Sequence, residues 1–256
     1  MERTQHSQSD DRAIAPLADH LLPVLHHRSA SIILLGPPGC GKGTQGKRIS
    51  ESLRIPLVSS GEILRANVRQ RTTLGLQAKR AVDSGELVSD DIILEMLLCR
   101  ILQPDCARGF VLDGVPRTTR QAAFLETQVF GREGARIPYV VLKLEMEDAS
   151  LIKRITGRRV CPLCGATYNI ETNPPLRRDK CDFDFSDLVL RADDRVEIFT
   201  RRLEEHRATS LEILSYLAAR YGVIPEVECD RPIGQVTLRL LELIHRATDR
   251  PAIKIS

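Results

Sequence analysis

"GPPGCGKGTQ", residues 36–45, is the stretch of this sequence that decides the fold. The apolar run "SIILL" (31–35) precedes it, and the segment after Lys42 has the spacing of an amphipathic helix. Between a strand and a helix, the glycines let successive backbone N–H groups turn toward phosphate oxygens, and the helix N-terminus adds partial positive charge. Lys42 stands where it can reach the outer phosphates of a ligand. We therefore predict a phosphate-binding loop.

Gly43 raises the question of how this loop would hold a metal ion. Many phosphate loops carry Ser or Thr directly after the lysine, and that hydroxyl binds Mg²⁺. A second apolar run, "GFVLDG" (109–114), contains Asp113, whose carboxylate can face Mg²⁺ across the loop. Gly114 beside it allows a ligand to approach the backbone closely. An Asp after a strand is common, so the assignment depends on the residues that follow, "DGVPRTTRQ".

Apolar runs and helical patterns alternate along much of the chain. Further strands are expected at 138–146 and 222–228, and helices at 90–102, 119–130 and 233–247. Continuous apolar strands separated by helices indicate an α/β fold with a parallel sheet covered on both faces. Two segments interrupt the alternation: 60–87 contains two polar, Arg-rich helices, and 157–191 contains prolines and clustered cysteines. Both are predicted to be insertions at the edge of the sheet.

The composition excludes several classes of protein. The 256 residues carry a net charge of +3, too small a surplus to predict nucleic-acid binding, and no apolar run reaches 18 residues, so no membrane span is expected. Asp10 and Asp11 argue against a signal or transit peptide in residues 1–30, which we expect to be a flexible extension of a cytoplasmic protein. The odd count of 7 cysteines argues against a disulfide framework.

Five segments taken together resemble one family. "GPPGCGKGTQ", "SSGEILR", "DGVPRTTRQ", "GRRVCPLCG" and "RADDR" occur in the order found in adenylate kinases, and the resemblance covers the chain from Ser31 to about Leu243. It implies a P-loop parallel sheet flanked by helices, a helical insertion that binds AMP, and a lid that closes over ATP. The implied parts are the extension 1–30, the core 31–59, 88–156 and 192–256, the helical insertion 60–87 and the lid insertion 157–191.

The resemblance also implies a reaction, ATP + AMP ⇌ 2 ADP, and a site. Mg²⁺ would be held mainly by phosphate oxygens and water, with Asp113 in a second layer around it and Thr44 as a nearby hydroxyl. The residues implied for ATP are Gly39, Cys40, Gly41, Lys42, Gly43, Thr44, Arg158 and Arg231. Those implied for AMP are Ser60, Arg65, Val88, Gly114, Arg117, Gln121, Arg191 and Arg202. The groups implied in catalysis are Lys42, Arg117, Arg158, Arg191 and Arg202.

The chemistry accounts for the many arginines. Phosphoryl transfer between two nucleotides brings two polyanions together, and the protein must neutralise them, align them and exclude water. Arginine binds phosphate with a planar, permanently charged fork. By the resemblance, Arg65 and Arg117 hold the AMP phosphate, Arg158 and Arg191 come from the lid, and Arg202 bridges the two substrates. Asp193 and Asp194 match the family's acids at the lid hinge, which would orient lid arginines or help organise Mg²⁺ water; an acidic start of a helix that complements the macrodipole is an equal alternative.

The cysteines of the lid insertion indicate a metal site. Cys161 and Cys164, and then Cys181 and Asp184, form two pairs with two residues inside each pair. Two such pairs are typical of a structural, tetrahedral Zn²⁺ site, and bacterial adenylate kinases have lids of this kind. The predicted ligands are Cys161, Cys164, Cys181 and Asp184, with Asp182 and Asp187 as rival oxygen donors for the fourth position. The alternative is a set of reduced cysteines left from a degraded site.

The sequence departs from the family pattern at two positions, and two other functions stay open. Glu62 stands where the family usually has Asp, and Val115 where it usually has Phe, so affinity is expected to shift while activity persists. A GTP-dependent AMP kinase is one alternative, because recognition of the donor base depends largely on backbone contacts. A non-catalytic nucleotide sensor with a zinc-ribbon lid is the other, and the retained lysine and arginines weigh against it. We expect a monomer whose partners are ATP, AMP and ADP.

Overall fold

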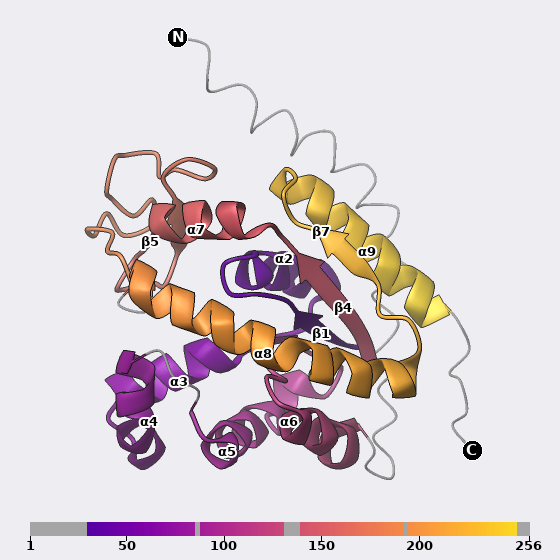
Figure 1. Cartoon of the computed structure of the whole chain (residues 1–256). Helices are drawn as coiled ribbons and strands as arrows, with labels where there is room; N and C mark the ends of the chain where they lie inside the picture. Colours follow the sequence, from indigo (N-terminus) through magenta and orange to yellow (C-terminus); the bar gives the residue numbers. More distant parts are fainter. Residues whose placement is uncertain (1–29, 85–87, 131–138, 192–193, 250–256) are drawn as a thin grey trace.

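The computed structural model describes residues 30–84, 88–130, 139–191 and 194–249, and a parallel sheet of five strands forms its centre (Figure 1). The strand order is β2-β3-β1-β4-β7, and every neighbouring pair is parallel. The strands are β1 (Ser31–Leu35), β2 (Leu57–Ser59), β3 (Val111–Asp113), β4 (Tyr139–Glu145) and β7 (Glu226–Glu228). The predicted α/β class and parallel sheet are confirmed.

Helices cover both faces of this sheet. Ile32 and Leu34 of β1 pack toward α2 (Lys42–Leu53) and α9 (Ile233–Asp249). Ile33 and Leu35 pack on the other face, toward α5 (Asp90–Ile101), α6 (Thr119–Phe124) and the C-terminal half of α8 (Val196–Tyr221). Because both faces of β1 are buried, its sequence is a continuous apolar run. Burying one such Leu or Ile side chain contributes about 1.5–3 kcal/mol.

The two insertions leave the core at the same end of the molecule, on either side of the N-terminal part of α8 (Figure 1). The helical insertion contains α3 (Ser60–Arg69) and α4 (Thr73–Ser84), which cross so closely at Gly75 that a Cβ there would lie 2.2 Å from the Asn67 carbonyl oxygen. The lid insertion follows α7 (Asp148–Gly157) and contains the hairpin of β5 (Arg158–Val160) and β6 (Thr167–Asn169).

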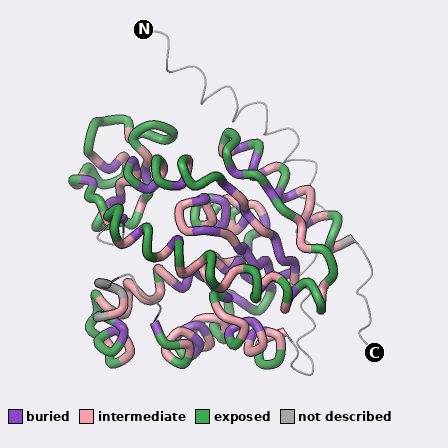
Figure 2. Tube along the Cα trace, viewed as in Figure 1, coloured by how far each residue is buried: buried purple, intermediate pink, exposed green. Residues whose placement is uncertain are grey.

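The lid insertion has only a small buried cluster of its own. It consists of Cys161, Tyr168, Cys181 and Leu188, with Ala166 packed against it. Figure 2 shows the same contrast: burial is concentrated along the sheet, and most of the lid insertion is exposed. A segment with so small a core cannot be ordered by apolar burial alone.

Most expected elements occur where the sequence placed them. The helix expected at 119–130 is α6 followed by a π-helical turn, η2 (Leu125–Phe130), and a short 3₁₀ turn, η1 (Pro104–Cys106), precedes β3. The sequence analysis did not assign the short strand β2 or the long helix α8. The expectation for residues 1–30 lies almost wholly outside the described residues, as do the end of the helical insertion at 85–87 and residues 192–193.

Candidate active site

A cavity of about 1450 Å³ lies at the carboxyl ends of β1, β3 and β4. Ligands of open α/β sheets bind at this edge, where loops and helix N-termini converge. The walls come from the loop after β1, the end of β3, α3, the lid insertion and α8. The predicted cations that line the cavity are Lys42, Arg65, Arg117, Arg158, Arg191, Arg202 and Arg231.

The loop between β1 and α2 has the backbone conformation of a phosphate cradle. Gly36, Gly39 and Gly41 all have positive φ angles, and a Cβ on Gly36 would lie 2.4 Å from the Leu144 carbonyl oxygen. Gly41 is the N-cap of α2 and brings no side chain to the helix N-terminus. The loop therefore needs glycine at these turns and leaves the end of α2 open to an anion.

Lys42 and Cys40 pack inside this loop. The Lys42 ammonium donates hydrogen bonds to the Gly36 and Pro37 carbonyl oxygens at 2.7 and 2.8 Å. The Cys40 thiol is buried 3.8 Å from the same ammonium group, and burial raises its pKa above the ordinary value. The thiol is therefore neutral, and the charge of the loop is that of Lys42.

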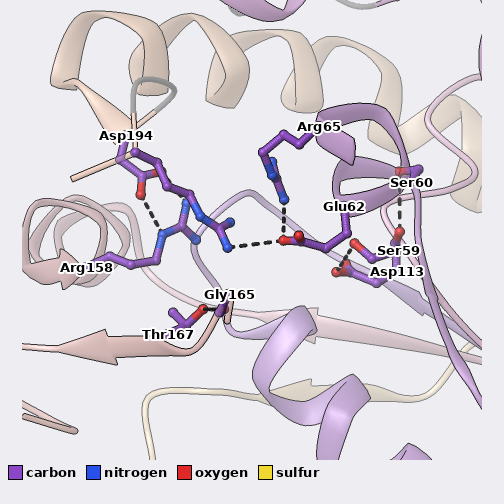
Figure 3. Close-up of polar contacts among 10 residues, drawn as sticks. Ser59, Ser60, Glu62, Arg65, Asp113, Arg158, Gly165, Thr167 and Asp194 are labelled. Atoms are coloured by element: carbon purple, nitrogen blue, oxygen red, sulfur yellow. Dashed lines mark hydrogen bonds and ion pairs between the residues drawn. The ribbon is translucent and has the colours of Figure 1, made fainter. Parts of the chain in front are cut away.

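Asp113 faces the loop from the end of β3. Its Oδ2 accepts a hydrogen bond from the Ser59 hydroxyl at 3.1 Å (Figure 3). A Cβ built on Gly43 would lie 3.6 Å from the same oxygen, so the carboxylate stands beside the position that carries Ser or Thr in other phosphate loops. The Asp113 carboxylate thus lies beside the start of α2.

Gly114 and Arg117 form the wall next to Asp113. Gly114 has φ +82°, and a Cβ there would lie 2.7 Å from the Ser60 hydroxyl oxygen, which donates to the Gly114 carbonyl at 3.0 Å. The Arg117 Nε also donates to that carbonyl, at 2.8 Å. Ser60 and Gln121 are buried directly behind this wall, and Val88 is buried as well. Of the predicted AMP residues, the cavity is lined by Arg65, Gly114, Arg117, Arg191 and Arg202, whereas Ser60, Val88 and Gln121 are not among its lining residues.

Glu62 joins two arginines of different insertions. Its Oε1 accepts from Arg65 Nη2 at 2.6 Å and from Arg191 Nη2 at 3.1 Å (Figure 3). Burial alone would raise the pKa of Glu62, but the charges of Arg65 and Arg191 and the hydrogen bond from Arg65 outweigh it and lower the pKa below its ordinary value. The carboxylate holds both guanidinium groups where they face the cavity.

Arg158 is paired with a fully buried carboxylate. Its Nε donates to Asp194 Oδ2 at 2.6 Å, and its Nη2 contacts Asp194 Oδ1, so the pair is bidentate (Figure 3). Asp194 is 1% exposed. Of the two open readings of Asp194, orientation of a lid arginine matches these contacts. Asp193 lies outside the described residues.

The remaining predicted cations come from α8 and from the segment after β7. Arg202 comes from α8 and lines the cavity. Arg231 follows β7, lines the cavity as well, and donates to Glu228 at 2.9 and 3.0 Å. The predicted cationic residues, scattered over nearly two hundred positions of sequence, are thus brought to one cavity by the parallel sheet.

Arg154 and His206 line the cavity as well, and the sequence analysis did not single them out. Arg154 of α7 donates to the Cys229 carbonyl at 2.7 Å, and its Nη1 would lie 3.7 Å from a Cβ on Gly41 of the phosphate loop. His206 of α8 has its pKa lowered to about 4, first by burial and then by the positive charges of Lys42 and Arg117. Arg154 lies on α7 whereas Arg158 begins β5, so no helical spacing in the sequence pointed to Arg154.

The four predicted metal ligands converge in the lid insertion. The ligand atoms of Cys161, Cys164, Cys181 and Asp184 all lie within 4.8 Å of one another. Cys164 and Cys181 have their sulfurs 3.5 Å apart, and Cys161 Sγ is 3.1 Å from Asp184 Oδ2. Tetrahedral zinc, with Zn–S bonds of about 2.3 Å, places thiolate ligands about 3.8 Å apart, so this donor set fits the ion.

The rival oxygen donors have other partners. Asp182 Oδ1 accepts the Leu176 N–H at 2.8 Å, and Asp187 pairs with Lys180 at 2.7 Å. Asp184 instead turns toward Cys161 and accepts from the Ser186 hydroxyl at 2.6 Å. The local hydrogen bonds therefore favour Asp184 as the fourth ligand.

Guanidinium groups on both sides of a phosphate loop suit an enzyme that brings two polyanions together. The fold and the cavity thus define the class, a phosphotransferase acting between two phosphate-bearing substrates. A family model described as adenylate kinase matches residues 34–221. The chain belongs to the adenylate kinase family, whose reaction is the reversible transfer ATP + AMP ⇌ 2 ADP with Mg²⁺.

Individual relatives are similar in sequence to this chain over almost their full length. An adenylate kinase of Clostridium botulinum is 40% identical over 84% of this chain and 98% of its own length. One of Clostridium beijerinckii is 38% identical over 83% of this chain and 97% of its own. One of Bacillus velezensis is 40% identical over 84% and 97%, respectively. The similarity therefore includes both insertions as well as the core.

Proposed function

We propose that the cavity binds MgATP on the phosphate loop and AMP between α3, Gly114 and Arg117. The observation that carries this assignment is the single cavity in which Lys42 and arginines of the core and both insertions face one another. An enzyme of this kind works by neutralising and aligning two polyanions, because phosphoryl transfer needs little covalent help from the protein. Nothing favours the GTP-dependent kinase or the non-catalytic sensor.

The donor side is formed by the loop and the lid insertion. Backbone N–H groups of residues 39–44 receive the phosphates of ATP, Lys42 neutralises the outer ones, and Arg158 approaches them from the lid. Arg154 and the backbone near Arg231 lie where the nucleoside would extend away from Asp113. Mg²⁺ supplies charge neutralisation of the transferring phosphoryl when bound. Asp113 would orient its water ligands, and the Thr44 hydroxyl stands nearby.

The acceptor side is formed by α3 and by the segment after β3. Arg65 and Arg117 hold the phosphate of AMP, while Arg191 and Arg202 neutralise charge that develops between the two substrates. Ser60, Val88 and Gln121 surround the base, and Gln121 offers a donor and an acceptor to its edge. Glu62 keeps Arg65 and Arg191 at the correct positions.

Closure of the lid insertion excludes water, which would otherwise accept the phosphoryl group. Arg158 belongs to the first strand of this insertion, so closing it and delivering a positive charge are one movement. Asp194 would fix the guanidinium plane during that movement. The chain's own residues therefore bind, align and shield the reactants.

One structural Zn²⁺ is proposed in the lid insertion, held by Cys161, Cys164, Cys181 and Asp184. Such a site is closed and has no position for substrate, so its contribution is to order the insertion. We also propose a cytoplasmic monomer that binds neither nucleic acid nor membrane. Within the described part of the chain, no helix combines the length and apolar content that a bilayer-spanning segment needs.

The test is ADP formation by the purified chain, with ATP or GTP as donor and AMP, CMP or UMP as acceptor. ATP with AMP should give the highest kcat/KM. A preference for GTP would replace the donor assignment. Nucleotide binding without ADP formation from any pair would support the sensor and overturn the proposal.

A further inference from the structure

Gln121 is held by a network of three other residues. Its Oε1 accepts the backbone N–H of Arg117 at 2.7 Å, and its Nε2 donates to Asp90 Oδ1 at 2.7 Å. The Thr118 hydroxyl donates to Asp90 Oδ2 at 2.8 Å and accepts the Gln121 N–H at 3.1 Å. Asp90 is the first residue of α5, Gln121 lies in the first turn of α6, and Arg117 and Thr118 directly precede α6, so the network joins two helices.

The two ends of this network have fixed polarity. A backbone N–H can only donate, and a carboxylate can only accept. Gln121 must therefore direct its carbonyl oxygen to Arg117 and its amino group to Asp90. Rotating the amide by half a turn would place oxygen against carboxylate and N–H against N–H. Gln121 is 2% exposed, so little water reaches the amide to relieve those contacts.

We propose that Asp90 is a positioning residue that fixes the direction of the Gln121 amide and thereby selects the acceptor base. This inference rests on the proposed contact between Gln121 and that base. Two of the amide's four hydrogen-bonding positions are used, which leaves one N–H and one carbonyl lone pair. Adenine offers the complement, an acceptor at N1 and an amino donor beside it, as in glutamine–adenine pairs.

Keto bases present the opposite pattern. Hypoxanthine and guanine carry a donor at N1 and an acceptor oxygen beside it, and uracil has the same arrangement on its smaller ring. With the amide fixed, the free N–H of Gln121 would face the ring N–H of such a base, and the amide oxygen would face the oxygen of the base. The substrate class is therefore a nucleoside monophosphate whose base has an amino group beside an unprotonated ring nitrogen, and AMP is the purine member of that class.

The experiment compares AMP with IMP, which differ at this edge alone. Asp90→Asn can turn either its oxygen or its amino group toward Gln121, so one of the two polarity constraints is lost. The ratio of kcat/KM for AMP to that for IMP should fall about tenfold, because the amide can then turn toward a keto base without facing a charged acceptor. Asp91→Asn is the matched control: it removes the same charge one residue away, where the carboxylate pairs with Arg120. Its ratio should stay within about twofold of the parent's.

Two further variants separate the possible outcomes. Asp90→Glu keeps an acceptor-only group and should retain the AMP to IMP ratio even if KM rises. If Asp90 only stabilises α5, Asp90→Asn will lower activity with AMP and IMP equally, and an unchanged ratio in the folded variant overturns the inference. Gln121→Ala tests the underlying assignment. If this variant leaves the AMP to IMP ratio unchanged, the proposed contact between Gln121 and the base is wrong. If Gln121→Ala changes the ratio but Asp90→Asn does not, only the role of Asp90 is rejected.

Discussion

The phosphate loop and the lid insertion face the same cavity, but different forces order them. The loop is continuous with β1, which is buried at all five positions, and it packs on Leu144 and Leu151 of the core. The lid insertion buries one small cluster and leaves large apolar side chains such as Leu176 and Phe183 exposed, at 90% and 73%. Packing of the core therefore forms the loop, whereas the lid insertion has little apolar packing of its own to order it.

This difference has a functional use. A cradle that holds phosphates by backbone N–H groups must be rigid, because its donors are fixed by the chain direction. A lid must open to exchange nucleotides, so extensive apolar contact with the core would slow it. A metal can order a short segment internally without attaching it to the core. The predictions below separate the two regions by changing one at a time.

The largest effect is expected in the loop. Lys42→Met should lower kcat by about a thousandfold or more, because it removes a charge aimed at the phosphoryl in flight. The melting temperature should change little, because the described hydrogen bonds of the Lys42 ammonium to backbone oxygens stay within the loop, at the Gly36 and Pro37 carbonyls. Lys153→Met, at an exposed position of α7, is the control and should keep its activity. Near-normal turnover by folded Lys42→Met would reject the assignment of the loop.

The next effect concerns the arginine of the lid insertion. Arg158→Ala would remove the Arg158 partner of buried Asp194, and breaking such a pair lowers stability by about 3–5 kcal/mol. A loss of activity in that variant could then come from unfolding as well as from catalysis. Arg158→Lys keeps the charge and loses the bidentate fork, so kcat should fall about a hundredfold with a small loss of stability. Arg159→Lys is the neighbouring control. If Arg158→Lys melts earlier but turns over normally at low temperature, the arginine is structural.

The sequence predicted the two regions to different depths, for a physical reason. The loop follows from local rules, because glycine, lysine and an apolar strand at fixed spacing allow few conformations. The metal ligands also follow from spacing, and Cys161, Cys164, Cys181 and Asp184 do converge. The strand β2 and the cavity residues Arg154 and His206 depend on which elements pack together, and a pattern of a few residues carries no such information. The direction of the Gln121 amide depends on Asp90, 31 residues away.

Removing the proposed zinc should loosen the lid insertion alone. A chelator should lower the melting temperature by several degrees and expose residues 157–191 to protease, while the far-UV circular dichroism of the core persists. Two exposed thiols provide the comparison: Cys164→Ser should make the protein insensitive to the chelator, and Cys99→Ser should leave it sensitive. Equal sensitivity of both variants, with equal metal content, would contradict a site at Cys164.

The smallest expected effect distinguishes two neighbouring carboxylates. Asp182 Oδ1 accepts the Leu176 N–H, so Asp182→Ala should cost about 0.5–1.5 kcal/mol and retain one zinc per chain. Asp184 lies against Cys161, so Asp184→Ala should bind zinc with lower affinity and release it sooner to a competing chelator.

Asp184→Cys completes the test, because a thiolate at this position keeps four ligands and should hold the ion at least as firmly as the parent. Zinc content after dialysis against increasing chelator orders the variants. The expected order of retention is Asp184→Cys, then the parent together with Asp182→Ala, then Asp184→Ala. Retention by Asp184→Ala with loss from Asp182→Ala would move the fourth ligand to Asp182. In that case Asp182 would bind the ion through its other carboxylate oxygen, because Oδ1 already accepts the Leu176 N–H and a carboxylate can use both oxygens at once.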